Sequence, residues 1–279
     1  EDVTNIDSLG IVTARSGINM SGGQFLVGTG VTIGVAGIAT FRSGRIDVND
    51  ALNNTSIGEG AGDAYTTGNN NIALGKNALT AATTGGANVA VGINALDANT
   101  TGASNVSVGY RALSGNTTAN QNTAVGYDAL LTNTTGAYNA AFGSYALQAS
   151  TTSSFNAAFG DSSLYTNTTG EKNAAFGYKA LYTNSTGVRN SAFGYTALEN
   201  NSTGDYNTAV GAYALDANTT ADDNTAIGYA ALIANTTGAT NTAVGAYALD
   251  ANVTHTNNTA IGYNALTAAT ADGNTGVGD

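Results

Sequence analysis

The sequence predicts an all-β protein, a parallel β-solenoid (β-roll) of about fourteen coils. From Asn54 onward the chain repeats every 17 residues, with the consensus N-T/A-A-V/I/F-G-Y-x-A-L-x-x-N-T-T-G-x-x. Each unit is too rich in Gly, Asn and Thr for a helical-hairpin repeat, which also needs about twice this length. Proline is absent from the chain, so every backbone N–H is available to a strand ladder.

Residues 1–50 precede the repeat and have a different pattern. Short runs of Val, Ile and Thr alternate with Gly, as in VTIGVAGIATF from Val31 to Phe41. Such runs predict brief strands joined by tight turns. The segment has few bulky apolar side chains, too few to bury a core alone. We therefore expect a β-rich stem or joint over residues 1–50 that depends on neighbouring chains, and a solenoid over residues 51–279.

Each repeat unit is numbered here from position 1, its opening Asn, to position 17. Apolar runs surround position 4 (Val210, for example) and position 9 (Leu215), and N-T-T-G follows the second run. Asn, Thr and Gly favour turns, so the pattern predicts two strands and two turns in each coil. The thirteenth unit is one residue short, which places the last Asn and Gly at Asn274 and Gly278.

Coils that stack about 4.8 Å apart place equivalent residues above one another. We expect position 4 and position 9 to form two buried apolar columns, and the Asn of position 1 to form an amide ladder in which each side chain bonds the next. The residues expected to build this framework near the C-terminal end are Asn207, Asn224, Asn241, Gly211, Gly228, Gly245, Leu215, Leu232 and Leu249.

A single coil offers only about two large aliphatic side chains, while Ala recurs at positions 3 and 8, as at Ala209 and Ala214. Small residues in register would let the backbone of another chain approach closely. The pattern therefore favours several identical rods side by side, most simply a parallel homotrimer.

Composition excludes several classes of function. The net charge is −11 and the chain has only 8 Lys and Arg residues, which disfavours a nucleic-acid partner. Cysteine is absent, so disulfides and thiolate metal sites are excluded. The sequence has no apolar run of about 18 residues, so we expect no membrane insertion.

Candidate chemical sites are weak. His255 is the only His, and no motif places a Ser or Cys nucleophile beside it. Asp222 and Asp223 lie where other coils carry Glu171 and Asp205, but without the spacing of a calcium loop. The glycines of Gly28–Gly30 lack the helix and Lys of a phosphate loop. We therefore expect no enzyme activity, no cofactor and no metal.

Two surface features suggest binding. Tyr recurs at position 6 or 7, and such rings could stack on the sugars of a surface polysaccharide or pack between chains. The residues expected to contact a surface are Tyr127, Tyr145, Tyr178, Tyr195, Tyr213 and Tyr229. The Thr pairs of N-T-T-G, such as Thr134-Thr135, resemble the Thr rows of ice-binding solenoids, although turn hydrogen bonds also account for them.

The motif N-T-A-V-G-Y-x-A-L resembles the head repeats of trimeric autotransporter adhesins. The 17-residue form with N-T-T-G is more similar to repeats of phage tail-fibre proteins, and the opening IDSLGIVTARSGINM and VTIGVAGIATF resemble strand repeats of cyanobacterial phage virions. These resemblances imply a trimeric β-roll that binds surfaces. No anchor barrel or chaperone domain of those families follows Asp279, so we expect a chain cut from a longer precursor.

The expected function is therefore a rigid, extracellular attachment rod, most simply part of a phage tail fibre or similar virion appendage, that binds a host cell-surface glycan or protein receptor. A bacterial trimeric adhesin head and an ice-binding solenoid are the alternatives. A depolymerising tailspike would require paired carboxylates facing one groove, and the acidic residues are instead scattered along the array.

Overall fold

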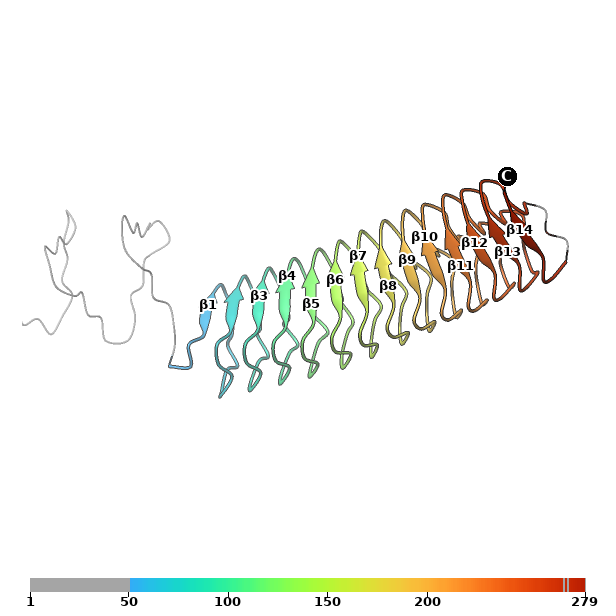
Figure 1. Cartoon of the computed structure of the whole chain (residues 1–279). Coiled ribbons are helices and arrows are strands. Elements are labelled where there is room, and N and C mark those ends of the chain that lie inside the picture. The colour runs from blue at the N-terminus through green and yellow to red at the C-terminus, as the bar shows by residue number, and fades with distance from the viewer. Residues whose placement is uncertain (1–50, 268, 270, 279) are drawn as a thin grey trace, which may run out of the picture. The chain divides into compact units, whose positions relative to one another are not determined.

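The computed structural model describes residues 51–267, 269 and 271–278, and the expected stem over residues 1–50 lies outside them. The described residues form one parallel sheet whose strands follow one another in chain order (Figure 1). The strands are β1 Thr55–Ile57, β2 Ile72–Leu74, β3 Val89–Val91, β4 Val106–Val108, β5 Thr123–Val125, β6 Ala140–Phe142, β7 Ala157–Phe159, β8 Ala174–Phe176, β9 Ser191–Phe193, β10 Thr208–Val210, β11 Thr225–Ile227, β12 Thr242–Val244, β13 Thr259–Ile261 and β14 Thr275–Val277.

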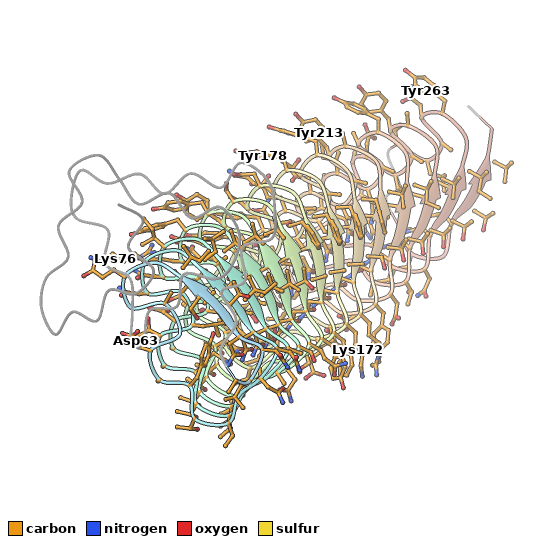
Figure 2. All side chains as sticks on the ribbon, turned by 90° about the vertical axis from the view of Figure 1, so that its left-hand side faces the viewer. Asp63, Lys76, Lys172, Tyr178, Tyr213 and Tyr263 are labelled. Carbon is orange, nitrogen blue, oxygen red and sulfur yellow. The ribbon has the colours of Figure 1, made fainter. Side chains whose placement is uncertain are left out.

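The register of the sheet follows the sequence repeat. Thr208 in β10 pairs with Thr225 in β11, one repeat further along the chain. In the final pair, Thr259 with Thr275, the spacing is one residue shorter because the thirteenth unit is shortened, and the strands still pair in order. Side chains of equivalent positions consequently form rows along the array (Figure 2). The predicted all-β, parallel solenoid is confirmed.

Each coil contains one strand, so the prediction of two strands was wrong. The second apolar run lies in a series of tight bends, where Gly211 has φ 135°, Tyr213 has φ 60° and Leu215 has φ 51°. These bends are too closely spaced for extended backbone to develop between them. The coils remain hydrogen-bonded here, since the Leu215 N–H donates to the Ala231 carbonyl oxygen at 3.0 Å.

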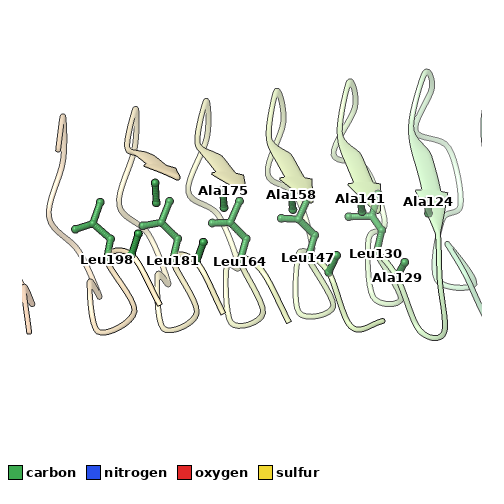
Figure 3. Packing of buried hydrophobic residues seen from close by; sticks show 14 of the residues in the cluster. Ala124, Ala129, Leu130, Ala141, Leu147, Ala158, Leu164, Ala175, Leu181 and Leu198 are labelled. Atoms are coloured by element: carbon green, nitrogen blue, oxygen red, sulfur yellow. The ribbon is translucent and has the colours of Figure 1, made fainter. Parts of the chain in front are cut away.

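The core is a single column of Leu at position 9, lined by Ala. Leu215 is fully buried, as are Ala209 at position 3 and Ala214 at position 8 of the same coil. Figure 3 shows the same arrangement in the middle of the array, with each Leu packed beside these Ala residues. The Leu column was predicted correctly. The interpretation of Ala as a contact for another chain was wrong, because these methyl groups fill the coil's own narrow interior.

The position-4 column lies on the outside, which corrects the second predicted core column. Ile57 is 51% exposed, Phe193 41% and Ile261 44%. Successive strand residues point to opposite faces, so a coil that turns position 3 inward must turn positions 2 and 4 outward. The small Ala therefore faces the interior, and the larger apolar side chain faces outward.

Candidate functional site

The Asn residues of position 1 form a buried ladder along the array. The backbone N–H and Nδ2 of Asn224 both donate to Asn207 Oδ1, at 3.0 and 3.2 Å. Asn241 donates to Asn224 Oδ1 in the same way, at 2.9 and 3.2 Å. Each amide thus bonds the preceding coil, and Asn207 Nδ2 also reaches the Ala221 carbonyl at 2.8 Å. The ladder fixes the register, since a slip would leave buried amides unpaired.

A second Asn ladder, at position 12, was missed by the sequence analysis. Asn201 Nδ2 donates to Asn184 Oδ1 at 2.8 Å, and both side chains are fully buried. The two ladders meet at position 15, where the Gly204 carbonyl accepts from Asn190 Nδ2 at 2.7 Å and from Asn201 Nδ2 at 2.9 Å. The signal was the near-constancy of Asn in N-T-T-G, where a turn alone would also admit Asp or Ser.

The Thr pairs are partly used by the fold. At position 13, Thr134 Oγ1 donates to the Thr151 carbonyl at 2.9 Å, and Thr219 Oγ1 donates to the Thr236 carbonyl at 3.1 Å. The second Thr of each pair, such as Thr135, is exposed. A row of paired, freely exposed hydroxyls, as the ice-binding alternative requires, is therefore absent from these turns.

The outer face of the sheet carries no charge, with apolar side chains at position 4 and mostly Thr, Ser or Ala at position 2. No strand from β1 to β14 contains an Asp, Glu, Lys or Arg. In the middle of the array Phe142, Phe159, Phe176 and Phe193 stack on one another, with ring centres 4.7, 4.7 and 4.8 Å apart. The result is a continuous apolar ridge along the rod, larger than the isolated apolar groups normal on a monomer's surface.

Tyr residues from the bends after the strands form a second strip, here called the tyrosine strip. Rings at the same repeat position lie nearly parallel, as in Tyr178 and Tyr195, with centres 5.3 Å apart and planes at 18°. Where Tyr is at position 6 of one coil and at position 7 of the next, the two rings meet edge to face. Tyr195 and Tyr213 are an example, with ring centres 5.4 Å apart and planes at 66°. Either geometry keeps neighbouring rings in contact within two runs, from Tyr110 to Tyr182 and from Tyr178 to Tyr263.

All six tyrosines named from the sequence belong to this strip. Tyr127 contacts Tyr145 at 5.4 Å, and Tyr213 contacts Tyr229 at 5.7 Å. Where positions 6 and 7 hold Asp and Ser, Tyr165 at position 10 continues the contact with Tyr145, at 6.3 Å. The strip's members are Tyr110, Tyr127, Tyr145, Tyr165, Tyr182, Tyr178, Tyr195, Tyr213, Tyr229, Tyr247 and Tyr263.

Lys179 joins the two halves of the strip. Its ammonium lies 5.5 Å from the centre of the Tyr178 ring and 5.0 Å from that of Tyr182. Only the parallel pairs, such as Tyr178 with Tyr195, cover one another's faces.

The ionisable groups of the described residues lie apart from one another, form ion pairs or take part in turns. No pocket and no group of three or more His, Cys, Asp and Glu that could hold a metal occur in the described part of the chain. His255 lies 3.5 Å from Asp272 Oδ1. Asp205 and Asp222 accept backbone N–H bonds from the preceding coil, both at 2.7 Å, so their carboxylates close the turns.

Among the described residues, Asp216 is the one carboxylate whose pKa is strongly shifted. Burial, with a smaller contribution from Glu199, raises the pKa of Asp216 to about 6. Its Oδ1 is buried without a hydrogen-bond partner, which explains why the charged form is disfavoured. The contributing carboxylate, Glu199, holds the same repeat position one coil earlier, and the shift indicates a local cost to folding at neutral pH.

No helix among the described residues is long and apolar enough to cross a bilayer. No protein-family model matches the sequence, and no curated protein or solved structure matches it significantly.

Proposed function

We propose that the chain is a rigid trimeric rod for surface attachment outside the cell, most simply part of a phage tail fibre or similar virion appendage. The observation that carries the proposal is the unbroken stack of in-register strands, without a pocket in the described residues. The outside of this stack bears the apolar ridge and the tyrosine strip. Such a molecule acts by its length, stiffness and repetition. A bacterial trimeric adhesin head would use the same properties.

Stiffness comes from hydrogen bonds that run along the rod. Each coil bonds its neighbours through the strand, through the bends and through both Asn ladders, as at Leu215, Asn207 and Asn201. Neighbouring coils cannot slide without breaking buried bonds, each of which costs free energy when left unmade. The rod therefore keeps its shape while it carries a load between its ends.

The apolar ridge is our proposed trimer interface. The chain carries a net charge of −11, so identical rods repel one another except where a face is uncharged, as the outer face of β1–β14 is. Only a partner with the same coil spacing can match the ridge over its full length, and an identical parallel chain has that spacing. Three chains then multiply weak contacts of the tyrosine strip with a host glycan or protein receptor into avidity.

Sedimentation equilibrium of the intact chain tests the assembly. We expect a trimer, and we expect Phe159→Glu to dissociate it because the substitution places a charge on the ridge. Thr135→Glu, on an exposed turn, is the matched control and should remain trimeric. A wild-type chain that stays monomeric at high concentration would refute the trimer.

A glycan array, together with binding to intact host cells, tests the attachment. We expect the double variant Tyr195→Ser/Tyr213→Ser to lose at least tenfold in binding, while Thr203→Ala, on an exposed turn, binds as the wild type does. Binding that is unchanged in the Tyr variant would remove the tyrosine strip from the proposal.

A further inference from the structure

Position 17 changes character over five successive coils in the middle of the array. The residues there, here called the position-17 patch, are Tyr138, Phe155, Lys172, Arg189 and Tyr206. In the flanking coils the same position holds small or polar residues, namely Asn70, Ala87, Ser104, Gln121, Asp223, Thr240 and Asn257. The bulky side chains are therefore confined to one segment of the rod.

The fold itself disfavours bulky side chains at this position. The backbone of position 17 is left-handed, with φ 61° at Tyr138, 62° at Phe155 and 57° at Tyr206. Asn and Asp tolerate this conformation, whereas large side chains adopt it rarely. These side chains are also about half exposed, at 51%, 52% and 49%, so core packing does not account for them.

The patch combines aromatic rings with cations. Tyr138 and Phe155 stack with ring centres 5.0 Å apart. Arg189 lies 5.2 Å from the centre of the Tyr206 ring and donates a hydrogen bond from Nη1 to the Tyr206 hydroxyl. Lys172, on the coil between Phe155 and Arg189, is exposed. Two cations on successive coils are thus flanked, before and after them along the array, by coils with aromatic side chains at the same position.

Within the described part of the chain, Lys172 and Arg189 differ from the other cations in having no carboxylate within ion-pair distance. The paired cations are Lys76 with Glu59, Arg111 with Asp128, and Lys179 with Glu199. The nearest acids along the chain are Glu171 and Asp205, and the Asp205 carboxylate accepts the Val188 N–H at 2.7 Å. The two cations therefore remain available to an outside anion.

We propose that the position-17 patch binds an acidic polysaccharide. A carboxylate or sulfate of the ligand bonds to Lys172 and Arg189, and neighbouring sugar rings pack on the flanking aromatic groups. Nucleic acid fits less well, because it carries a phosphate at every nucleotide and would meet the chain's net charge of −11 along its whole length. A polysaccharide with acidic groups at intervals needs only these two cations.

This inference rests on the proposed attachment function and assigns it a second contact. Figure 2 shows Lys172 on a different edge of the rod from Tyr178, Tyr213 and Tyr263 of the tyrosine strip. The two sites can therefore be disabled separately.

The test uses the intact chain and two forms of one polymer, partly methyl-esterified polygalacturonate and the fully esterified, uncharged form, with binding measured by interferometry. We expect the acidic form to bind at least tenfold more tightly than the neutral one, and its affinity to fall as salt rises. The double variant Lys172→Gln/Arg189→Gln should lose that advantage. Lys76→Gln, a cation elsewhere on the rod, should retain it, and circular dichroism should be the same for all the proteins.

Equal binding of the two polymers by the wild type, or unchanged binding of the acidic form by the double variant, would overturn the proposal. So would tighter binding of single-stranded DNA of equal length. If the double variant is unaffected while Tyr195→Ser/Tyr213→Ser reduces attachment to glycans or cells, only this inference fails. If the intact chain binds no glycan and no host cell, the proposed attachment function fails with it.

Discussion

Single residues in this fold are constrained by the coil above as much as by their own neighbours in sequence. Gly177 at position 5 shows this most directly. Its φ is 141°, and a Cβ built on it would lie 2.2 Å from the carbonyl oxygen of Gly194 in the next coil. The backbone conformation and the close approach of the two coils both require glycine. The Gly of the consensus is therefore a consequence of stacking.

We predict that Gly177→Ala destabilises the rod by about 3 kcal/mol or more, because the added methyl forces adjacent coils apart and strains the backbone. Thermal unfolding monitored by circular dichroism measures the effect. Gly86→Ala is the matched control, because Ala103, Ala137 and Ala239 already occupy the equivalent position 16 in other coils and Gly86 is not among the glycines with positive φ. Equal losses from the two substitutions would contradict the account.

Asp216 predicts a dependence of stability on pH. The pKa of Asp216 is about 6 in the folded chain, above the ordinary value of 3.8 for an Asp side chain. The folded state therefore holds a proton between these values that the unfolded state releases, so this group's contribution to stability falls as pH rises through that window. We expect Asp216→Asn to raise the free energy of unfolding at pH 7 by about 1 kcal/mol, after allowance for solvent screening.

Thermal or denaturant unfolding of the wild type and Asp216→Asn at pH 7 and at pH 4 checks this expectation. The difference between the two proteins should shrink at the lower pH, where the wild-type carboxyl is protonated. A difference that does not change with pH would mean that the gain has another origin. Both proteins carry the same remaining carboxylates, so those groups cancel in the comparison.

At the scale of the element, the repeat predicted the coil but not which side chains face inward. The Leu column and the register followed from periodicity alone. The inward side of the strand did not, because hydrophobicity favours Val210 over Ala209 while the structure buries Ala209. The space beside the central Leu determines which strand residue faces inward, because only a small side chain fits there. That space depends on backbone bends such as the one at Leu215. The residues of the tyrosine strip were predicted from the sequence, but the angles between their rings were not. Those angles depend on whether successive coils place Tyr at the same position or alternate between positions 6 and 7.

The position-12 ladder contains a natural defect. Ser150 replaces Asn there and bonds to Ser153 at 2.6 Å, and Asn133 Oδ1 is left buried without a partner. We predict that Ser150→Asn with Ser153→Gly restores the consensus and raises the free energy of unfolding by about 1 kcal/mol, through a new amide bond to Asn133. Unfolding in guanidinium measures the gain. Thr152→Asn, on the exposed side of the same turn, should give none.

At the scale of the whole molecule, the array is a stack in which each strand pairs only with the strands before and after it. Its stability is therefore close to a sum over coils and their interfaces. We predict that deletion of residues 190–206, one complete unit, leaves the register intact and changes the melting temperature by only a few degrees. Deletion of residues 190–198 should greatly reduce the stability of the fold and the cooperativity of its unfolding. The deletion removes about half a unit, so the later coils can no longer align their equivalent positions with those of the earlier coils. Comparable melting curves for the two deletions would argue against the stack.

The alignment of hydrogen bonds along the axis also has a mechanical consequence. If the described array is pulled from its two ends, tension acts along the bonds between the terminal coil and its neighbour, and the interior coils keep their partners. Coils then detach singly, each releasing 17 residues, or up to about 58 Å of extended chain. Once the pulling force exceeds the force needed to detach one coil, the array unfolds one coil at a time. The mechanical energy is then dissipated in many small steps.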